Sequence, residues 1–197
     1  MKTLLIVYHS MTGGTLQMAQ AAAQGAMSEA AVTVRLLPAS QADADDMLTA
    51  DGYLFATPEY LAAISGVLKD FFDRSYYPVL DRVNGRPYGL MVCAGSDGSN
   101  AVRQIERIVT GWRLRPVAEP LIVCTRAQTA AEIMRPKQID AAERALPRVG
   151  CGNGKRSGYG GVLKRRRPAA CVQHRRQPGL GRRGQAAQPA ATRRNQP

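Results

Sequence analysis

The sequence predicts an α/β fold in which helices cover both faces of a doubly wound sheet of parallel strands. Short apolar runs alternate with longer segments whose apolar residues recur at helical spacing. The runs are apolar at consecutive positions, so both faces of each strand are expected to be buried, as in a parallel sheet. The length of 197 residues suits one such domain and an appendage.

The first half of the alternation contains three strands and one helix. The run KTLLIVYH, residues 2–9, predicts a strand that is buried on both faces. A helix is predicted over 15–27, where the apolar residues fall at helical spacing: Leu16, Ala19, Ala23 and Met27. The β-branched and leucine-rich runs at 31–37 and 51–57 predict the second and third strands.

The second half adds two helices and two strands. A helix is predicted over 64–74, where the large apolar side chains share one face: Ile64, Val67, Leu68, Phe71 and Phe72. The run YGLMVCAG predicts a fourth strand over 88–95. The next helix is predicted over 99–112, with Gly111 able to end it and an apolar stripe at Val102, Ile105, Ile108, Val109 and Trp112. PLIVC, residues 120–124, predicts the fifth strand.

Three polar loops leave the carboxyl ends of the first, third and fourth strands: HSMTGGT, ATPEYLAAIS and CAGSDGSN. Ligands of parallel α/β sheets bind beyond these strand ends, so the loops are expected to converge on one site.

The first loop has the composition of an anion site, because Ser10, Thr12 and Thr15 surround Gly13 and Gly14. Hydroxyls and backbone N–H groups at a helix start favour a bound phosphate. A triphosphate P-loop needs a lysine, and a dinucleotide loop needs G-x-G-x-x-G; this loop has neither. Its neutral donors favour one phosphomonoester. The alternative is an ordinary helix start capped by Ser or Thr.

The distribution of charge and the cysteine spacing argue against several classes of protein. Thirteen of the 27 Lys and Arg residues lie from Arg148 onward, where no Asp or Glu occurs. Residues 1–147 therefore carry fourteen basic and fifteen acidic residues, so the net charge of +12 does not by itself indicate nucleic-acid binding. The four cysteines show no C-x-x-C spacing, which argues against a zinc site or a disulfide framework and fits a cytoplasmic protein. No export signal or membrane span is expected.

The order S-x-T-G-x-T, then TPEY…SGVLKDFFDR, then CAGSDGS resembles the flavodoxin-like family of FMN proteins over residues 2–147. The likeness is greatest to its NAD(P)H-dependent FMN and quinone reductases, of the tryptophan-repressor-binding-protein type. The resemblance implies a five-stranded sheet in the order 2-1-3-4-5. It also implies that the chain can form homo-oligomers.

The resemblance implies three groups of FMN-binding residues. In the family, the first loop binds the FMN phosphate, which here corresponds to Ser10, Met11, Thr12, Gly13, Gly14 and Thr15. The second loop lies against the isoalloxazine ring, which corresponds to Thr57, Pro58, Glu59 and Tyr60. The third loop borders the ring from the other side, which corresponds to Ala94, Gly95, Ser96, Asp97 and Gly98.

The residue types suit these roles. Pro58 would fix the backbone of the second loop, and Tyr60 offers an aromatic face with a polar tip. Gly95 lets the backbone approach the ring closely. Glu59 and Asp97 are expected to be solvated surface groups.

The chemistry implied is hydride transfer from NAD(P)H to FMN, followed by reduction of a quinone or similar small acceptor. No catalytic acid or base and no metal is required. Two other classes remain open: a one-electron carrier flavodoxin, although carriers usually have a strongly acidic surface, and a polyanion-binding protein that uses its tail.

Residues 148–197 depart from the family. Pro147 and Gly150 stop the expected last helix, and the sequence that follows is basic, glycine-rich and poor in large aliphatic residues. Such a tail is expected to be disordered and to bind nucleic acid without base preference. It is either a basic arm for a polyanion or, as we favour, an out-of-frame reading of a GC-rich gene.

Overall fold

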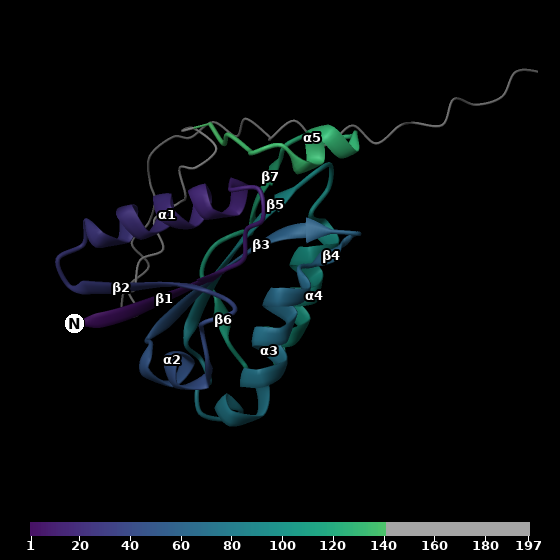
Figure 1. Ribbon diagram of the computed structural model, residues 1–197. Coiled ribbons are helices and arrows are strands. Elements are labelled where there is room, and N and C mark those ends of the chain that lie inside the picture. Colours follow the sequence, from purple (N-terminus) through teal and green to yellow (C-terminus); the bar gives the residue numbers. More distant parts are fainter. Residues whose placement is uncertain (141–197) are drawn as a thin grey trace, which may run out of the picture. The chain divides into compact units, whose positions relative to one another are not determined.

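The computed structural model describes residues 1–140 (Figure 1). The described residues all belong to one compact unit. The expected domain boundary at residue 147 and the basic tail at 148–197 lie outside the described residues, so both stay predictions.

The sheet confirms the predicted parallel topology. The strands β1 (Lys2–Tyr8), β2 (Val32–Pro38), β3 (Gly52–Tyr60) and β5 (Pro87–Ala94) pair in the order β2-β1-β3-β5. The predicted fifth strand is present as two pieces, β6 (Arg115–Pro116) and β7 (Leu121–Cys124), which both pair with β5 in parallel. Pro116 and Pro120 flank the break, and proline has no N–H to donate to a continuous ladder. The expected order 2-1-3-4-5 is therefore present.

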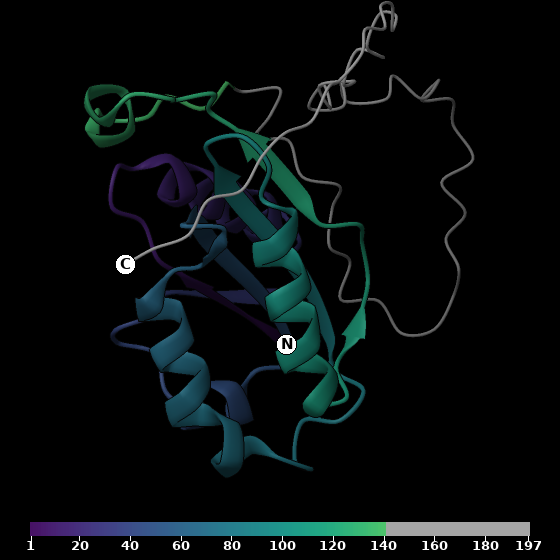
Figure 2. The same cartoon turned by 90° about the vertical axis from the view of Figure 1, so that its right-hand side faces the viewer.

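Helices cover both faces of the sheet. The helix α1 (Gly14–Met27) lies on one face, while α3 (Gly66–Val79) and α4 (Ser99–Gly111) lie on the other (Figures 1 and 2). The strand β1 shows why its apolar run is continuous. Leu4 and Ile6 pack with α1, whereas Leu5 and Val7 join the core beneath α3 and α4. The expected burial on both faces is confirmed.

Three short elements had no predicted counterpart. The helix α2 (Ala44–Thr49) begins with a capping box, in which Asp43 and Asp46 each accept from the other's backbone N–H at 3.0 Å. The strand β4 (Ala63–Ile64) pairs antiparallel with the end of β3 and forms a hairpin there. The helix α5 (Ala130–Met134) follows β7 and also begins with a capping box.

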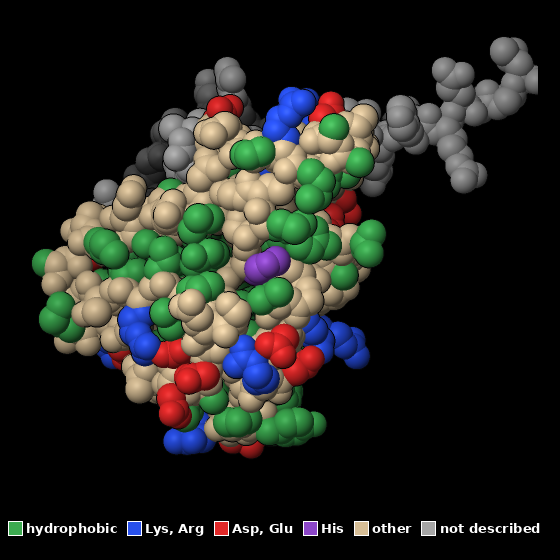
Figure 3. All heavy atoms as spheres, viewed as in Figure 1, with side chains coloured by type: hydrophobic (Ala, Val, Ile, Leu, Met, Phe, Trp, Pro, Cys, Tyr) green, Lys and Arg blue, Asp and Glu red, His purple; other side chains and the backbone are tan. Residues whose placement is uncertain are grey.

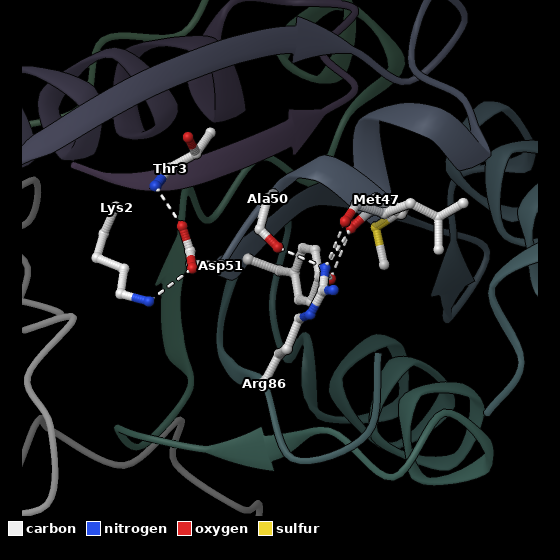
Figure 4. A network of polar contacts seen from close by, with 8 residues as sticks. Lys2, Thr3, Met47, Ala50, Asp51 and Arg86 are labelled. Carbon is white, nitrogen blue, oxygen red and sulfur yellow. Dashed lines mark hydrogen bonds and ion pairs between the residues drawn. The ribbon is translucent and has the colours of Figure 1, made fainter. Parts of the chain in front are cut away.

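A polar network stabilises the end of α2 (Figure 4). The Arg86 guanidinium donates to the carbonyls of Met47, Leu48 and Ala50 at 3.0, 2.9 and 2.6 Å, and to the Tyr53 hydroxyl at 3.0 Å. Carbonyls at a helix C-terminus have no partner within the helix, so one arginine satisfies several of them. The network joins α2 to the segment that leads into β5.

Asp51 ties the start of β1 to the start of β3. Its carboxylate accepts from the Lys2 ammonium and from the Thr3 N–H, both at 2.8 Å (Figure 4). These bonds lower the pKa of Asp51. The stabilisation is therefore present above the ordinary carboxyl pKa and is lost as the pH falls through the lowered value.

We expect Arg86→Ala to lower the free energy of unfolding by on the order of 2–3 kcal/mol, because the carbonyls at the end of α2 lose their donor. Arg82→Ala is the matched control, since Arg82 is exposed and makes one long bond of 3.4 Å to the Pro78 carbonyl. Urea titrations of both variants measure the difference. Equal losses would contradict the role assigned to Arg86.

Candidate functional site

A cleft of about 440 Å³ lies at the carboxyl edge of the sheet. Four segments line it: the loop between β1 and α1, the β3–β4 hairpin, the loop between β5 and α4, and residues 125–137 after β7. The three loops predicted to converge therefore do so, and they are joined by a fourth segment.

Most of the predicted site residues line this cleft. Those that do are Ser10, Met11, Thr12, Gly14, Thr15, Pro58, Glu59, Tyr60, Ala94, Gly95 and Ser96. Those that do not are Gly13, Thr57, Asp97 and Gly98.

Two of the residues outside the cleft wall are glycines that start helices. Gly13 precedes α1 with φ 86° and Gly98 precedes α4 with φ 81°, a left-handed conformation that favours glycine. A Cβ on Gly98 would also lie 2.7 Å from a methyl carbon of Ile122. These glycines shape the loops rather than line the cleft.

Thr57 and Asp97 also lie outside the cleft wall. The strand β3 continues beyond its expected end to Tyr60, so Thr57 pairs with Val92 inside the sheet and is fully buried. Its hydroxyl accepts from the Ser65 N–H at 3.2 Å and lies 2.9 Å from the Pro58 carbonyl oxygen. Asp97 is exposed, as expected, and accepts from the Ser99 hydroxyl.

The start of α1 has the features of an anion site. Its N-cap is Gly13, and no side chain caps the helix, so the alternative of an ordinary Ser- or Thr-capped start is wrong. The first N–H groups of the helix therefore lack a side-chain acceptor. Thr15 lines the cleft and is 1% exposed. Its hydroxyl has no hydrogen-bond partner among the described residues. A buried hydroxyl without a partner costs stability unless a ligand bonds to it.

The helix start lies unusually close to the sheet. A Cβ on Gly14 would be 2.7 Å from the Cys93 sulfur at the end of β5 and 3.3 Å from the Cβ of Lys137. Any larger residue at position 14 would push α1 away from the strand ends.

The β3–β4 hairpin forms the opposite wall and is tied to α4. Leu61 and Ala62 have φ of 50° and 58°, as a two-residue hairpin requires, although neither is glycine. The Asn100 side chain donates to the Ala62 carbonyl, and the Ile64 N–H donates to the Gln104 side chain at 3.1 Å. Contacts from α4 thus hold a strained turn in place.

Glu59 joins the hairpin to the third loop. One carboxylate oxygen accepts from the Gly98 N–H at 2.8 Å, so the expectation of a solvated surface group is wrong for Glu59. The other oxygen is buried without a partner among the described residues. Glu59 lines the cleft and can accept a hydrogen bond from a ligand there.

Tyr60 and His9 meet edge to face beside the first loop, with ring centroids 6.1 Å apart. Burial raises the pKa of Tyr60 and lowers the pKa of His9. Both shifts favour the uncharged form of the ring.

The described residues 1–140 contain no group of three or more His, Cys, Asp or Glu side chains that could bind a metal ion. Within the same part of the chain, no helix combines the length and apolar character that crossing a membrane requires.

Comparisons with known proteins agree with this geometry. Residues 37–128 match the family of NADPH-dependent FMN reductases. An NAD(P)H dehydrogenase (quinone) from Acidithiobacillus ferrooxidans is 33% identical over 95 residues, which cover 38% of this chain and 48% of the relative. The solved WrbA-like flavodoxin from Agrobacterium tumefaciens has a TM-score of 0.53 at 20% identity, and the match covers 68% of this chain and 89% of that one.

These similarities support a relation of residues 37–128 to the flavodoxin-like FMN reductases. A flavodoxin from Aquifex aeolicus is 35% identical over 96 residues, which cover 49% of this chain and 50% of the relative. The chain thus spans about half the length of the curated relatives it matches. The flavodoxin-like fold expected from the sequence is confirmed.

The family resemblance gave no indication of the fourth wall of the cleft. This wall is formed by Thr125, Ala127, Gln128, Ile133 and Lys137. Lys137 lies more than a hundred residues from the first loop in sequence, yet its N–H donates to the Thr12 carbonyl at 2.8 Å. No local pattern marks such a contact, so the sequence predicted a phosphate loop without a basic residue nearby.

We expect Gly14→Ala to destabilise the fold by about 1–3 kcal/mol, because the added Cβ overlaps the Cys93 sulfur. The same change in a Cys93→Ala background should cost less, since the sulfur is gone. Gly25→Ala is the control, because nothing lies within 4 Å of its Cβ position in α1; it should be neutral or slightly stabilising. Thermal unfolding of Gly14→Ala, Cys93→Ala, the double variant and Gly25→Ala measures these costs, and an equal cost of Gly14→Ala in both backgrounds would exclude the sulfur contact as the cause.

Proposed function

We propose that the chain is an FMN-dependent oxidoreductase that transfers a hydride from NAD(P)H, through FMN, to a quinone or similar small acceptor. The observation that carries this proposal is the buried Thr15 hydroxyl at the uncapped start of α1, which has no hydrogen-bond partner within residues 1–140 and lines a cleft shared with three other segments. A volume of about 440 Å³ lies in the range of small-molecule and cofactor sites.

The residues present fit the parts of FMN. The N–H groups at the start of α1 and the Thr15 hydroxyl would hold the phosphomonoester. Pro58 and Tyr60 from the hairpin, and Gly95 from the third loop, would border the flat ring. FMN, when bound, supplies the electron chemistry, so the protein's part is to bind, orient and enclose it.

The rim of the cleft favours a small acceptor over a protein partner. Met11, Leu61 and Ile133 stand on its lining segments and are exposed by 56%, 102% and 46%. Figure 3 shows that charged side chains of both signs gather over α2 and α3, away from a largely uncharged surface beside β3 and α1. The exposed apolar side chains of the rim suit flat apolar molecules such as a nicotinamide or a quinone ring.

The second candidate function is that of a one-electron carrier, which the similarity to the Aquifex aeolicus flavodoxin favours. A carrier exchanges electrons with protein partners and is usually guided by surface charge. The near balance of charge over residues 1–147 favours the reductase.

We expect FMN to bind much more tightly than riboflavin, because riboflavin lacks the phosphate. Thr15→Val should weaken FMN binding by on the order of 1–3 kcal/mol while leaving riboflavin affinity unchanged. It should also raise the stability of the flavin-free protein, since it removes a buried hydroxyl without a partner. Fluorescence titration and thermal unfolding measure these effects, and equal affinity of the unmodified protein for FMN and riboflavin would overturn the phosphate site.

We expect NADH or NADPH to bleach the bound flavin under anaerobic conditions in a single two-electron phase, and added quinone to restore its colour. Free FMN at the same concentration, without protein, is the control. The measurement is stopped-flow absorbance at the flavin band. A stable radical signal on stepwise chemical reduction, with no bleaching by either nucleotide, would favour the electron carrier.

A further inference from the structure

We propose that Lys137 contacts the phosphate of FMN and sets the preference of this site for the phosphorylated flavin. This inference rests on the proposed function and adds to it a residue from outside the phosphate loop. Lys137 lines the same cleft as Thr15, and the first atoms of its side chain lie against the start of α1. Its Cβ and Cγ are 3.3 and 3.5 Å from the Cβ position of Gly14.

The segment that carries Lys137 is fixed to the helix and loop that form the anion site. We call residues 136–139 the Lys137 strap. Its Lys137 N–H donates to the Thr12 carbonyl at 2.8 Å. The side-chain amide of Gln17 donates to the Lys137 carbonyl at 2.6 Å and accepts from the Ile139 N–H at 3.1 Å. Both ends of one amide thus hold the strap to α1.

Apolar packing holds the strap as well. Ile139 is 3% exposed and belongs to the same core cluster as Met18 and Ala19 of α1. The position of Lys137 therefore follows from packing and backbone bonds, which place its side chain at the wall of the cleft.

Within residues 1–140, the ammonium of Lys137 forms no ion pair with a carboxylate. It donates to the Glu132 carbonyl, which leaves two of its three protons for other acceptors. The Glu132 carboxylate accepts from the N–H groups of Gln128 and Thr129, both at 3.0 Å. These bonds, and to a smaller extent the charge of Lys137, lower the pKa of Glu132, whose carboxylate is held in the α5 capping box.

A phosphomonoester carries a charge of about −1.5 to −2 at neutral pH. The first loop offers only neutral donors, namely backbone N–H groups and hydroxyls, among them the buried and unpartnered Thr15 hydroxyl. One ammonium at the same site adds a charge-assisted bond, which is stronger than a neutral one. Riboflavin presents a neutral hydroxyl there and gains little from it. Lys137 therefore discriminates between the two flavins.

The test compares flavin affinities rather than turnover. We expect Lys137→Gln to weaken FMN binding about tenfold, equivalent to 1.4 kcal/mol, and to leave riboflavin affinity unchanged. Lys137→Arg should retain most of the FMN preference. Lys69→Gln is the matched control, because Lys69 lies on α3, is ion-paired with Asp73 and does not line the cleft. Equal weakening of FMN and riboflavin, or no weakening of either, would overturn the role of Lys137.

Gln17 provides a second test as a positioning residue. Gln17→Ala releases the Lys137 strap and should lower the FMN-to-riboflavin affinity ratio. When Lys137→Gln is already present, adding Gln17→Ala should lower the ratio no further, because both changes remove the same contact between Lys137 and the phosphate. Additive effects on the ratio would contradict the coupling.

If the unmodified protein fails to prefer FMN, the proposed function itself is wrong, whereas a preference that Lys137→Gln leaves intact refutes only this inference.

Discussion

The cleft depends on the close contact between the start of α1 and the end of β5. A Cβ at Gly14 would lie 2.7 Å from the Cys93 sulfur, so only glycine lets the helix begin directly at the carboxyl edge of the sheet. This contact brings the positive end of the helix dipole, and the N–H groups that no side chain caps, to the floor of the cleft. The other walls are arranged around that point.

Each wall is tied to another wall by a bond between elements distant in sequence. Glu59 of the hairpin accepts from Gly98 of the third loop, and Lys137 donates its N–H to Thr12 of the first loop. The hairpin also keeps two non-glycine residues, Leu61 and Ala62, at positive φ. Strain and unpartnered buried oxygens both cost stability, and proteins tolerate such costs where ligands bind. Here the Leu61–Ala62 turn and the unpartnered oxygens of Thr15 and Glu59 line one cleft.

The elements that local sequence determines were predicted well. The continuous apolar run of β1 indicated burial on both faces, and the structure places Leu4 and Leu5 in different cores. The first loop was predicted because hydroxyl residues and paired glycines after a buried strand are unusual. In both cases the signal lies within a few consecutive residues.

The elements that tertiary contacts determine were not predicted. Thr57 was expected to face the ligand, but pairing with β5 extends β3 and buries Thr57 between Val92 and Ser65. Lys137 was missed because it reaches the first loop through contacts with Thr12 and Gln17, more than a hundred residues away. A single sequence carries no periodicity or spacing that records such contacts.

The cleft has hydrogen-bond donors on one side and an acceptor on the other, and a ligand must match this arrangement. On the side of α1, the Thr15 hydroxyl and the Lys137 ammonium can donate to an anion. On the side of the hairpin, the free oxygen of Glu59 accepts only, because ionised carboxylates have no proton to give. A molecule that is anionic throughout would be repelled by Glu59, and a molecule without an anionic group would leave the α1 side unsatisfied. These groups suit a ligand with an anionic group at one end and an N–H donor at the other, a pattern that the proposed cofactor FMN has.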